Sequence, residues 1–322
     1  MKICLLTNQE LNKNPLPADD WPCDPRPFYK KATWHVETLV KGKAVKQVKE
    51  LAKKKFDLYF NLCDGAADEE DNPGVEVVKT LEKLKVPFTG ADSNFFEPSR
   101  KRMKEVCLAN KIKTPAFAFV KSVKETKKIL ENLKFPMIVK HYSSYASIDL
   151  TKRSVVNNEK ELKTQVRRIC KKHGSSLIEE FISGTECTVL VAEGLNKRTI
   201  TYTPIQYKFP LGETFKHEAI KWKDFDKVDA FPVTNKTLEK KLRSITSRFF
   251  KGIGGVSYGR CDFRVDENNC PYLLEINPNC GLYYPLSASA SADLCLLAQK
   301  SGHEKFTRQI IRSALNRLQN SC

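Results

Sequence analysis

One segment, residues 259–277, constrains the fold more than any other part of the chain. It consists of two strand-forming stretches, GRCDFRV and YLLEIN, separated by a short polar turn. The pattern predicts an antiparallel hairpin in which ENNC forms a four-residue loop between Asp266 and Pro271. The expected register pairs Arg264 with Leu273, Asp262 with Glu275, and Arg260 with Asn277.

This register separates polar from apolar side chains, because side chains alternate between the two faces of a strand. The polar face is expected to carry Arg260, Asp262, Glu275 and Asn277. The opposite, buried face is expected to carry Cys261, Phe263, Val265, Tyr272, Leu274 and Ile276. A slip of one residue would bring carboxylates into the core, so the pattern favours this pairing.

The polar face has the chemistry of a metal site. Two carboxylates and an amide oxygen repel one another unless a positive charge lies between them. Oxygen ligands of this kind suit Mg²⁺ or Mn²⁺, which retain water and also bind phosphates. The alternative is a solvated sheet face with a surface Arg–Asp pair that contributes little to stability. The Asn-Pro pair that ends the second stretch favours the metal site.

The remainder of the chain predicts a mixed α/β (α+β) fold in three parts. In residues 1–97, strand and helix patterns alternate (KICLLTN, a helix at 45–55, FDLYFNL, GVEVVKTLEKL), which is typical of a parallel sheet. The Pro- and Asp-rich stretch from Gln9 to His35 is predicted to be an irregular loop. Residues 98–185 read as a smaller α+β unit with mostly antiparallel strands, and residues 186–322 as a third unit that contains the hairpin.

Composition limits the class of protein. The 322 residues contain no apolar run of the roughly 18 residues that a membrane-spanning helix needs, and MKICLLTN lacks the zones of a signal peptide. We therefore expect a cytoplasmic protein that does not bind membranes. The eleven cysteines are scattered without a CxxC pair, which predicts free thiols.

The net charge of +17 calls for an explanation. Lysines such as those of VKQVKELAKKK fall mostly on the polar sides of helical patterns, and no basic stretch is interleaved with aromatic residues. Nucleic acid is therefore not expected as the main partner, although binding of a polyanion by the basic surface stays open as a weaker alternative.

The motifs resemble a known superfamily over nearly the whole chain. GRCDFRVDENNCPYLLEINPNCGL is similar to the metal-binding end of ATP-grasp proteins, and most closely to their D-alanine–D-alanine ligase-like branch. FDLYFNLCDGAADEEDNPGVEVVKTLEKLKVPFTGADS resembles that branch's N-terminal domain, FPMIVKHYSSYASIDLT its lysine strand and phosphate loop, and SLIEEFISGTECTV its adenine-side strand. The resemblance implies an ATP-grasp fold: a Rossmann-like N-terminal domain followed by a central and a C-terminal subdomain that clasp ATP.

The resemblance also implies a binding site for ATP and two Mg²⁺ or Mn²⁺ ions. Asp262, Glu275 and Asn277 match the metal ligands. The groups expected at the phosphates are Lys140, Lys221, the hydroxyls of Ser144 and Ser147, and Arg100, which stands where the family usually has lysine. Lys140 could instead be a solvent-facing strand end, and Arg100 a surface helix residue.

On the adenine side, Glu179 is expected to accept a hydrogen bond from the adenine amino group, and the backbone around Phe181 and Ile182 to contact the ring edge. Glu186 matches the residue that holds the ribose hydroxyls. Strand alternation requires at least one of Glu179 and Glu180 to face water, and Glu179 is the residue expected to face inward.

The implied reaction is that of an ADP-forming carbon–nitrogen ligase with small-molecule carboxylate and amine substrates. A carboxylate takes the γ-phosphoryl group of ATP, and an amine then displaces phosphate. Arg260 matches an arginine that stabilises the tetrahedral adduct, and Gly281 would let a backbone N–H approach the same oxyanion. Related ligases are often dimers, so a homodimer is compatible with the resemblance.

Two departures from the family bear on the expected function: the phosphate loop indicates weak turnover, and the region after Gly281 predicts substrates other than D-alanine. The phosphate-loop segment SSYASIDL has no glycine, with Tyr145 and Asp149 at two expected glycine positions; a turn there would have to avoid positive φ, and Asp149 would have to point away from the phosphates. After Gly281, LYYPLSASASADLC replaces the family's serine-containing segment, and the N-terminal glutamate expected for D-alanine is not found. Tyr283 and Tyr284 either line an acceptor pocket or form a structural aromatic pair. A catalytically silent ATP-binding or scaffold protein is the alternative function.

Overall fold

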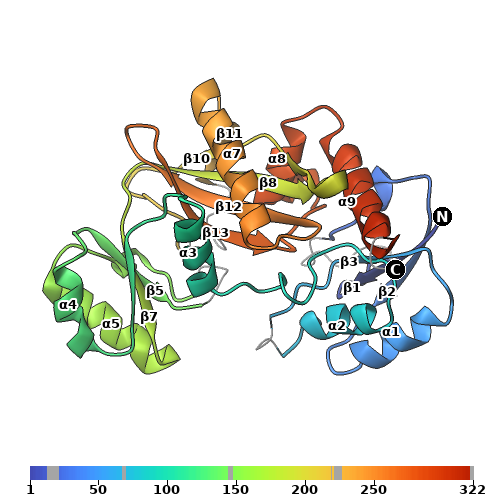
Figure 1. The fold of residues 1–322 in the computed structure, drawn as a ribbon, viewed down its shortest axis with the longest axis horizontal. Helices are drawn as coiled ribbons and strands as arrows, with labels where there is room; N and C mark the ends of the chain where they lie inside the picture. The colour runs from blue at the N-terminus through green and yellow to red at the C-terminus, as the bar shows by residue number, and fades with distance from the viewer. Residues whose placement is uncertain (13–21, 67–69, 144–147, 219, 221–226, 320–322) are drawn as a thin grey trace.

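The structure is a computed structural model and describes residues 1–12, 22–66, 70–143, 148–218, 220 and 227–319. The strands of the described residues form three β-sheets. Figure 1 shows the first sheet and its helices at one end of the long axis, the second sheet at the other end, and the third sheet between them. Within the described residues, no helix combines the length and the apolar character needed to cross a membrane.

The N-terminal sheet is parallel, as the alternating pattern predicts. Its strands lie in the order β2-β1-β3 and pack against α1 and α2. Five successive residues of β1 are buried, which is typical of a parallel strand covered on both faces. The elements are β1 (Lys2–Thr7), β2 (Thr33–Thr38), α1 (Ala44–Ala52), β3 (Leu58–Asn61) and α2 (Val75–Lys83).

One strand of this sheet contradicts the sequence-based prediction. The loop predicted from Gln9 to His35 ends too late, because β2 begins at Thr33 and pairs with β1 along its full length. β2 is the edge strand, and its residues are only partly buried or exposed. An edge strand with His35 and Glu37 on it lacks the apolar alternation by which a buried strand is identified.

The second sheet is antiparallel in the order β4-β7-β5-β6. Its longest helix is α5 (Glu159–His173), which is capped by the Asn158 side chain and ends at Gly174 in the left-handed conformation. Leu162, Val166 and Ile169 share one buried face of that helix. The other elements are β4 (Phe117–Val120), α4 (Thr126–Leu130), β5 (Met137–His141), β6 (Val155–Val156) and β7 (Ser176–Glu180).

The third sheet has the order β11-β10-β8-β12-β13, with β9 also pairing with β8. Helices cover both of its faces, so six residues in a row of β8 are buried. Its strands are β8 (Thr185–Glu193), β9 (Thr199–Thr201), β10 (Ile205–Lys208), β11 (Asp229–Pro232), β12 (Tyr258–Val265) and β13 (Pro271–Pro278). Its helices are α7 (Lys236–Gly252), α8 (Ser291–Leu297) and α9 (Gly302–Gln319).

Helix α3 (Arg100–Ala109) links the sheets and positions part of the site. It precedes the second sheet in sequence, yet Met103 and Cys107 lie in the same apolar cluster as Leu242 and Phe249 of α7. The second sheet ends within residues 98–185, while β8 begins at Thr185, one residue before the third predicted unit. The division at 97 and 185 stays a prediction.

Candidate active site

The hairpin of β12 and β13 brings the predicted metal ligands together. Arg260 lies opposite Asn277, and Asp262 opposite Glu275, as the sequence predicts. Beyond Asp262 the register shifts, so that Arg264 faces Tyr272 and the predicted pair of Arg264 with Leu273 is wrong. The shift is a β-bulge, in which Leu274 is the extra residue.

The bulge also changes which side chains reach the core. Leu273 is 1 % exposed and packs with Cys261, Phe263, Val265 and Ile276. Tyr272 and Leu274, which the regular alternation assigns to that face, are only partly buried, so their assignment to the core is wrong. An inserted residue reverses the alternation on one side of the bulge and leaves the Asp262–Glu275 end unchanged.

Asp262 is the most heavily hydrogen-bonded group of the polar face. Arg260 donates from Nε to Oδ1 at 2.9 Å and from Nη2 to Oδ2 at 2.8 Å, Thr188 donates to Oδ1 at 2.7 Å, and the Asn277 amide donates to Oδ2 at 2.9 Å. Burial acts to raise the pKa of Asp262, but Arg260 outweighs it and holds the pKa below its ordinary value. The carboxylate is therefore ionised at neutral pH.

Glu275 meets a second guanidinium. Nη2 of Arg100, the first residue of α3, lies 3.0 Å from Glu275 Oε2. Arg100 is thus directed into the site, and its alternative as an ordinary surface helix residue is wrong. Each of the two carboxylates is paired with an arginine, so positive charge already lies where the repulsion between them demands it.

The residues of this face fit Mg²⁺ by type of donor. Two carboxylates and one amide are the oxygen ligands that Mg²⁺ takes in phosphate-binding sites. Nowhere in the described part of the chain do three or more His, Cys, Asp or Glu side chains form a group that could hold a metal, so a metal bound here would need Asn277 as its third ligand. A cation here would share the carboxylates with Arg260 and Arg100.

Glu179 occupies a buried ionic cluster next to this face. It is 1 % exposed, and its carboxylate lies between the ammonium groups of Lys104 and Lys140, the latter at 2.5 Å. Lys140 therefore points inward, and its alternative as a solvent-facing strand end is wrong. Burial acts to raise the pKa of Glu179, but the two lysines hold it well below its ordinary value.

The sequence interpretation missed Lys104. This lysine is buried on α3 and also contacts the Thr114 hydroxyl at 2.5 Å. Burial lowers its pKa, while Glu179 opposes that effect. Arg100, Lys104 and Cys107 are spaced so that they share one helix face. That spacing, beside a residue already assigned to the site, was the signal that could have found Lys104.

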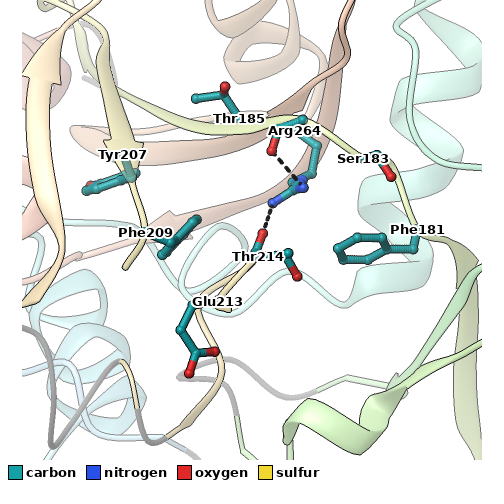
Figure 2. Close-up of a pocket in the computed structure, with 9 residues that line it drawn as sticks. Phe181, Ser183, Thr185, Tyr207, Phe209, Glu213, Thr214 and Arg264 are labelled. Carbon is teal, nitrogen blue, oxygen red and sulfur yellow. Dashed lines mark hydrogen bonds between the residues drawn. The ribbon is translucent and has the colours of Figure 1, made fainter. Parts of the chain in front are cut away.

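The predicted adenine and ribose contacts lie where β7 leads into β8. The Phe181 amide donates to the Pro136 carbonyl at 2.8 Å, and the Ile182 carbonyl accepts from Arg264 at 2.9 Å. Glu186, at the start of β8, accepts from the Lys216 amide at 3.1 Å, and burial raises its pKa. A cavity of about 260 Å³ opens here, lined by Phe181, Ser183, Gly184, Thr185, Tyr207, Phe209, Glu213, Thr214 and Arg264 (Figure 2).

The structure describes only some of the residues predicted to bind the phosphates. Ser144, Ser147, Tyr145 and Lys221 lie outside the described residues. Asp149 is described, and its φ of +58° lies in the left-handed region that favours glycine, so the condition that this turn avoid positive φ is not met at that position. Its carboxylate is 2.8 Å from Lys172 and 2.6 Å from His173, both on α5.

Gly281 lies against the aromatic residues that follow it. A Cβ at Gly281 would come within 2.8 Å of the Tyr284 ring, so the close approach of that ring requires glycine. Tyr283 is a buried core residue that packs against Phe28, Phe60 and Phe306, which supports the structural alternative for it. Tyr284 is the residue of the pair that lies next to the predicted oxyanion donor.

Comparisons with known proteins agree with this arrangement. Residues 110–296 match the family model described as D-ala D-ala ligase C-terminus. A D-alanine–D-alanine ligase of Neisseria meningitidis is 29 % identical over 268 residues, covering 79 % of this chain and 83 % of the relative. One from Bordetella petrii is 26 % identical over 257 residues, covering 77 % and 76 %.

Solved structures show the same fold. The D-alanine–D-alanine ligase of Bacillus anthracis complexed with ATP superposes with a TM-score of 0.71 at 17 % identity over all of both chains. The VanG D-Ala:D-Ser ligase of Enterococcus faecalis gives a TM-score of 0.68 at 16 % identity, covering 97 % of this chain and 99 % of that one. At these identities the likeness concerns the fold.

Proposed function

Because the chain belongs to the D-alanine–D-alanine ligase-like branch of the ATP-grasp superfamily, we propose that it is an ADP-forming ligase that joins a carboxylate to an amine. The observation that carries the proposal is the pairing of Asp262 with Glu275 across the hairpin, with an arginine on each carboxylate. A merely solvated sheet face does not require two partly buried ion pairs side by side.

The proposed reaction has two steps. The substrate carboxylate attacks the γ-phosphorus of ATP, which breaks the bond to the β-phosphate oxygen and releases ADP with formation of an acyl phosphate. The amine then attacks the acyl carbon, loses a proton, and displaces inorganic phosphate to leave an amide. Positioning and electrostatic stabilisation suffice for both steps, and no protein nucleophile is required.

The chain's own residues divide this work. Arg100 and Lys140 would contact the phosphates, and Glu179 keeps Lys140 in place through their 2.5 Å ion pair. Arg260, held by Asp262, would stabilise the oxyanion of the tetrahedral adduct together with the Gly281 N–H. Asp262, Glu275 and Asn277 would hold Mg²⁺, which when bound neutralises the charge of the phosphates.

We propose substrates other than a pair of D-alanines. The segment after Gly281 differs from the family's serine-containing segment, and the Tyr284 ring lies against Gly281 itself. An aromatic side chain beside the reacting centre favours an acceptor with an apolar or aromatic portion. The cytoplasmic location and the homodimer stay predictions.

Release of ADP tests the proposed function directly. The purified protein is incubated with ATP, Mg²⁺ and a panel of acid–amine pairs, and both ADP and the mass of the ligated product are measured. We expect Glu275→Gln to abolish turnover and Glu239→Gln, a partly buried ion-pair partner on α7, to leave it unchanged. A Glu275→Gln variant that turns over at the wild-type rate would contradict the proposal.

The alternative function, a silent ATP-binding or scaffold protein, was motivated by the glycine-poor phosphate loop. The Asp149 carboxylate is engaged by Lys172 and His173 of α5, which offsets its charge and weakens that motive. Thermal stabilisation by Mg²⁺ and ATP, without turnover of any substrate pair, would favour the alternative.

A further inference from the structure

Arg264 is a buried arginine with no role in the reaction proposed above. It lies on β12, two residues after Asp262, and only 4 % of it is exposed. Because side chains alternate along the strand, Arg260, Asp262 and Arg264 point to the same face. Taking a guanidinium out of water costs several kcal/mol unless its N–H groups find partners.

The partners of Arg264 come from two segments that are distant in sequence from β12. Nε donates to the Ile182 carbonyl at 2.9 Å, Nη2 to the Gly184 carbonyl at 2.9 Å, and Nη1 to the Thr214 carbonyl at 2.7 Å. Figure 2 shows Arg264 among the residues that line the cavity, with a dashed line to Thr214. The guanidinium also lies over the Phe181 ring, 5.0 Å from its centre.

Arg264 reaches the proposed ribose ligand as well. Its Nη1 lies 3.4 Å from Oε1 of Glu186. The same oxygen accepts from the Lys216 amide at 3.1 Å. Two donors therefore fix this carboxylate at the start of β8, next in sequence to Thr185, which lines the cavity.

Residues 181–184 form the connection between the second and third sheets. This connection lies close against β12, because a Cβ at Gly184 would come within 2.0 Å of the Val265 carbonyl. The same short segment carries the backbone atoms that are expected at the adenine edge. Arg264 thus joins the connection to the strand that carries the metal ligand Asp262.

We propose that Arg264 is a positioning residue for ATP, which holds residues 181–184 and Glu186 at a fixed place relative to Asp262. The adenosine half and the triphosphate half of the nucleotide then meet a preformed site. This inference rests on the proposed function. If Arg264 served only to stabilise the fold, its loss would affect all ligands of the site alike.

Binding of three ligands separates these roles. ATP, 2′-deoxy-ATP and inorganic tripolyphosphate are titrated calorimetrically, each with Mg²⁺, into the wild type, Arg264→Met and Arg264→Lys. The matched control is Arg243→Met on α7, whose guanidinium likewise binds a backbone carbonyl (Thr201) and a carboxylate (Glu239) but lies outside the cavity.

We expect Arg264→Met to weaken ATP binding by about tenfold or more. A tenfold change in affinity is roughly what one hydrogen bond to a charged group contributes, and this variant removes the hydrogen bonds that hold the site in place. Binding of 2′-deoxy-ATP should weaken less, because it makes fewer contacts with Glu186, so the preference for ATP shrinks. Tripolyphosphate binding should stay unchanged, Arg264→Lys should fall between, and Arg243→Met should match the wild type.

The inference is overturned if Arg264→Met keeps the wild-type affinity and preference for ATP, or if all three ligands weaken equally. Should Arg264→Met fail to fold, hydrogen exchange of residues 182–186 in Arg264→Lys replaces it. If the amides of residues 182–186 exchange faster in Arg264→Lys than in the wild type, and ATP slows this exchange only in part, the inference is supported. Exchange at the wild-type rate overturns it. If the wild type binds ATP and Arg264→Met binds it equally well, this inference alone is contradicted, whereas a wild type that does not bind ATP contradicts the proposed function too.

Discussion

At the scale of residues, charge pairing organises the candidate site. Asp262, Glu275 and Glu179 each lie against at least one arginine or lysine, and all three are wholly or mostly buried. Opposite charges at this distance hold the pKa values of Asp262 and Glu179 below their ordinary values, so these two carboxylates are ionised at neutral pH. The pairs also leave cations beside the place where the phosphates are expected, so we expect ATP to replace the carboxylates as a partner of these cations.

Lys104, which the sequence interpretation missed, is expected to contribute strongly to the free energy of unfolding. Lys104→Met leaves the buried Glu179 carboxylate with one cation instead of two. Breaking a buried pair from one side typically costs about 3–5 kcal/mol, and we expect a loss of free energy of unfolding of that order. Urea unfolding measures it.

Lys101→Met is the matched control, because Lys101 lies exposed on the same helix. It should change the free energy of unfolding by less than about 0.5 kcal/mol. The double variant Lys104→Met, Glu179→Gln should recover part of the loss, since it removes the uncompensated charge. Equal stability of Lys104→Met and Lys101→Met would contradict the buried cluster.

The same cluster predicts a pH dependence of stability. The folded pKa of Glu179 lies below its unfolded value of about 4.3, so the unfolded chain binds the proton first as the pH falls. Its contribution is complete well above that value and is lost progressively below about pH 5. We expect Glu179→Gln to lower stability at pH 7 but to flatten the decline between about pH 5 and pH 3. A decline as steep as in the wild type would show that Glu179 is not the group responsible.

At the scale of elements, a single buried carboxylate anchors the segment between β13 and α8. Asp293 accepts from the Tyr283 amide at 2.8 Å and from the Ala290 amide at 3.2 Å, and His303 lies 2.8 Å from it. It therefore holds both ends of the loop that leaves Gly281. Tyr283 within this loop has a φ of +67°, a conformation that a non-glycine residue keeps only when its surroundings enforce it.

We expect Asp293→Ala to release this loop. Several donors lose their buried acceptor, so the free energy of unfolding should drop by about 2–4 kcal/mol. The KM for the amine or carboxylate substrate should rise while affinity for ATP is retained, because the loop adjoins Gly281 and not the adenine side. Urea unfolding measures the loss of stability, steady-state kinetics the KM, and calorimetric titration the affinity for ATP. Loss of ATP affinity in step with the substrate would contradict this division.

The hairpin shows what could be predicted from sequence at this scale. Opposed Asp262 and Glu275 follow from alternation counted back from the turn, and that part of the register is confirmed. The bulge at Leu274 could not be found in this way, because Leu273 and Leu274 are both apolar and either can face the core. Strand β2 was missed for the related reason that an edge strand shows weak alternation.

At the scale of the whole molecule, long-range packing limits prediction. The order of strands and helices and the mixed α/β class could be predicted, because they follow from local periodicity and from the family resemblance. The contact between Lys104 of α3 and Glu179 of β7 could not be predicted, because the local sequence does not specify which sheet a helix packs against. The contacts of Arg264 with residues 182, 184 and 214 depend on packing in the same way.

The most direct test of the central claim is calorimetric titration of ATP, with and without Mg²⁺, into the wild type and the double variant Asp262→Asn, Glu275→Gln. If the hairpin holds the metal beside the triphosphate, ATP binding by the wild type requires Mg²⁺ for full affinity, and the double variant loses that dependence together with most of the affinity. Equal, Mg²⁺-dependent binding by the wild type and the double variant would contradict the account.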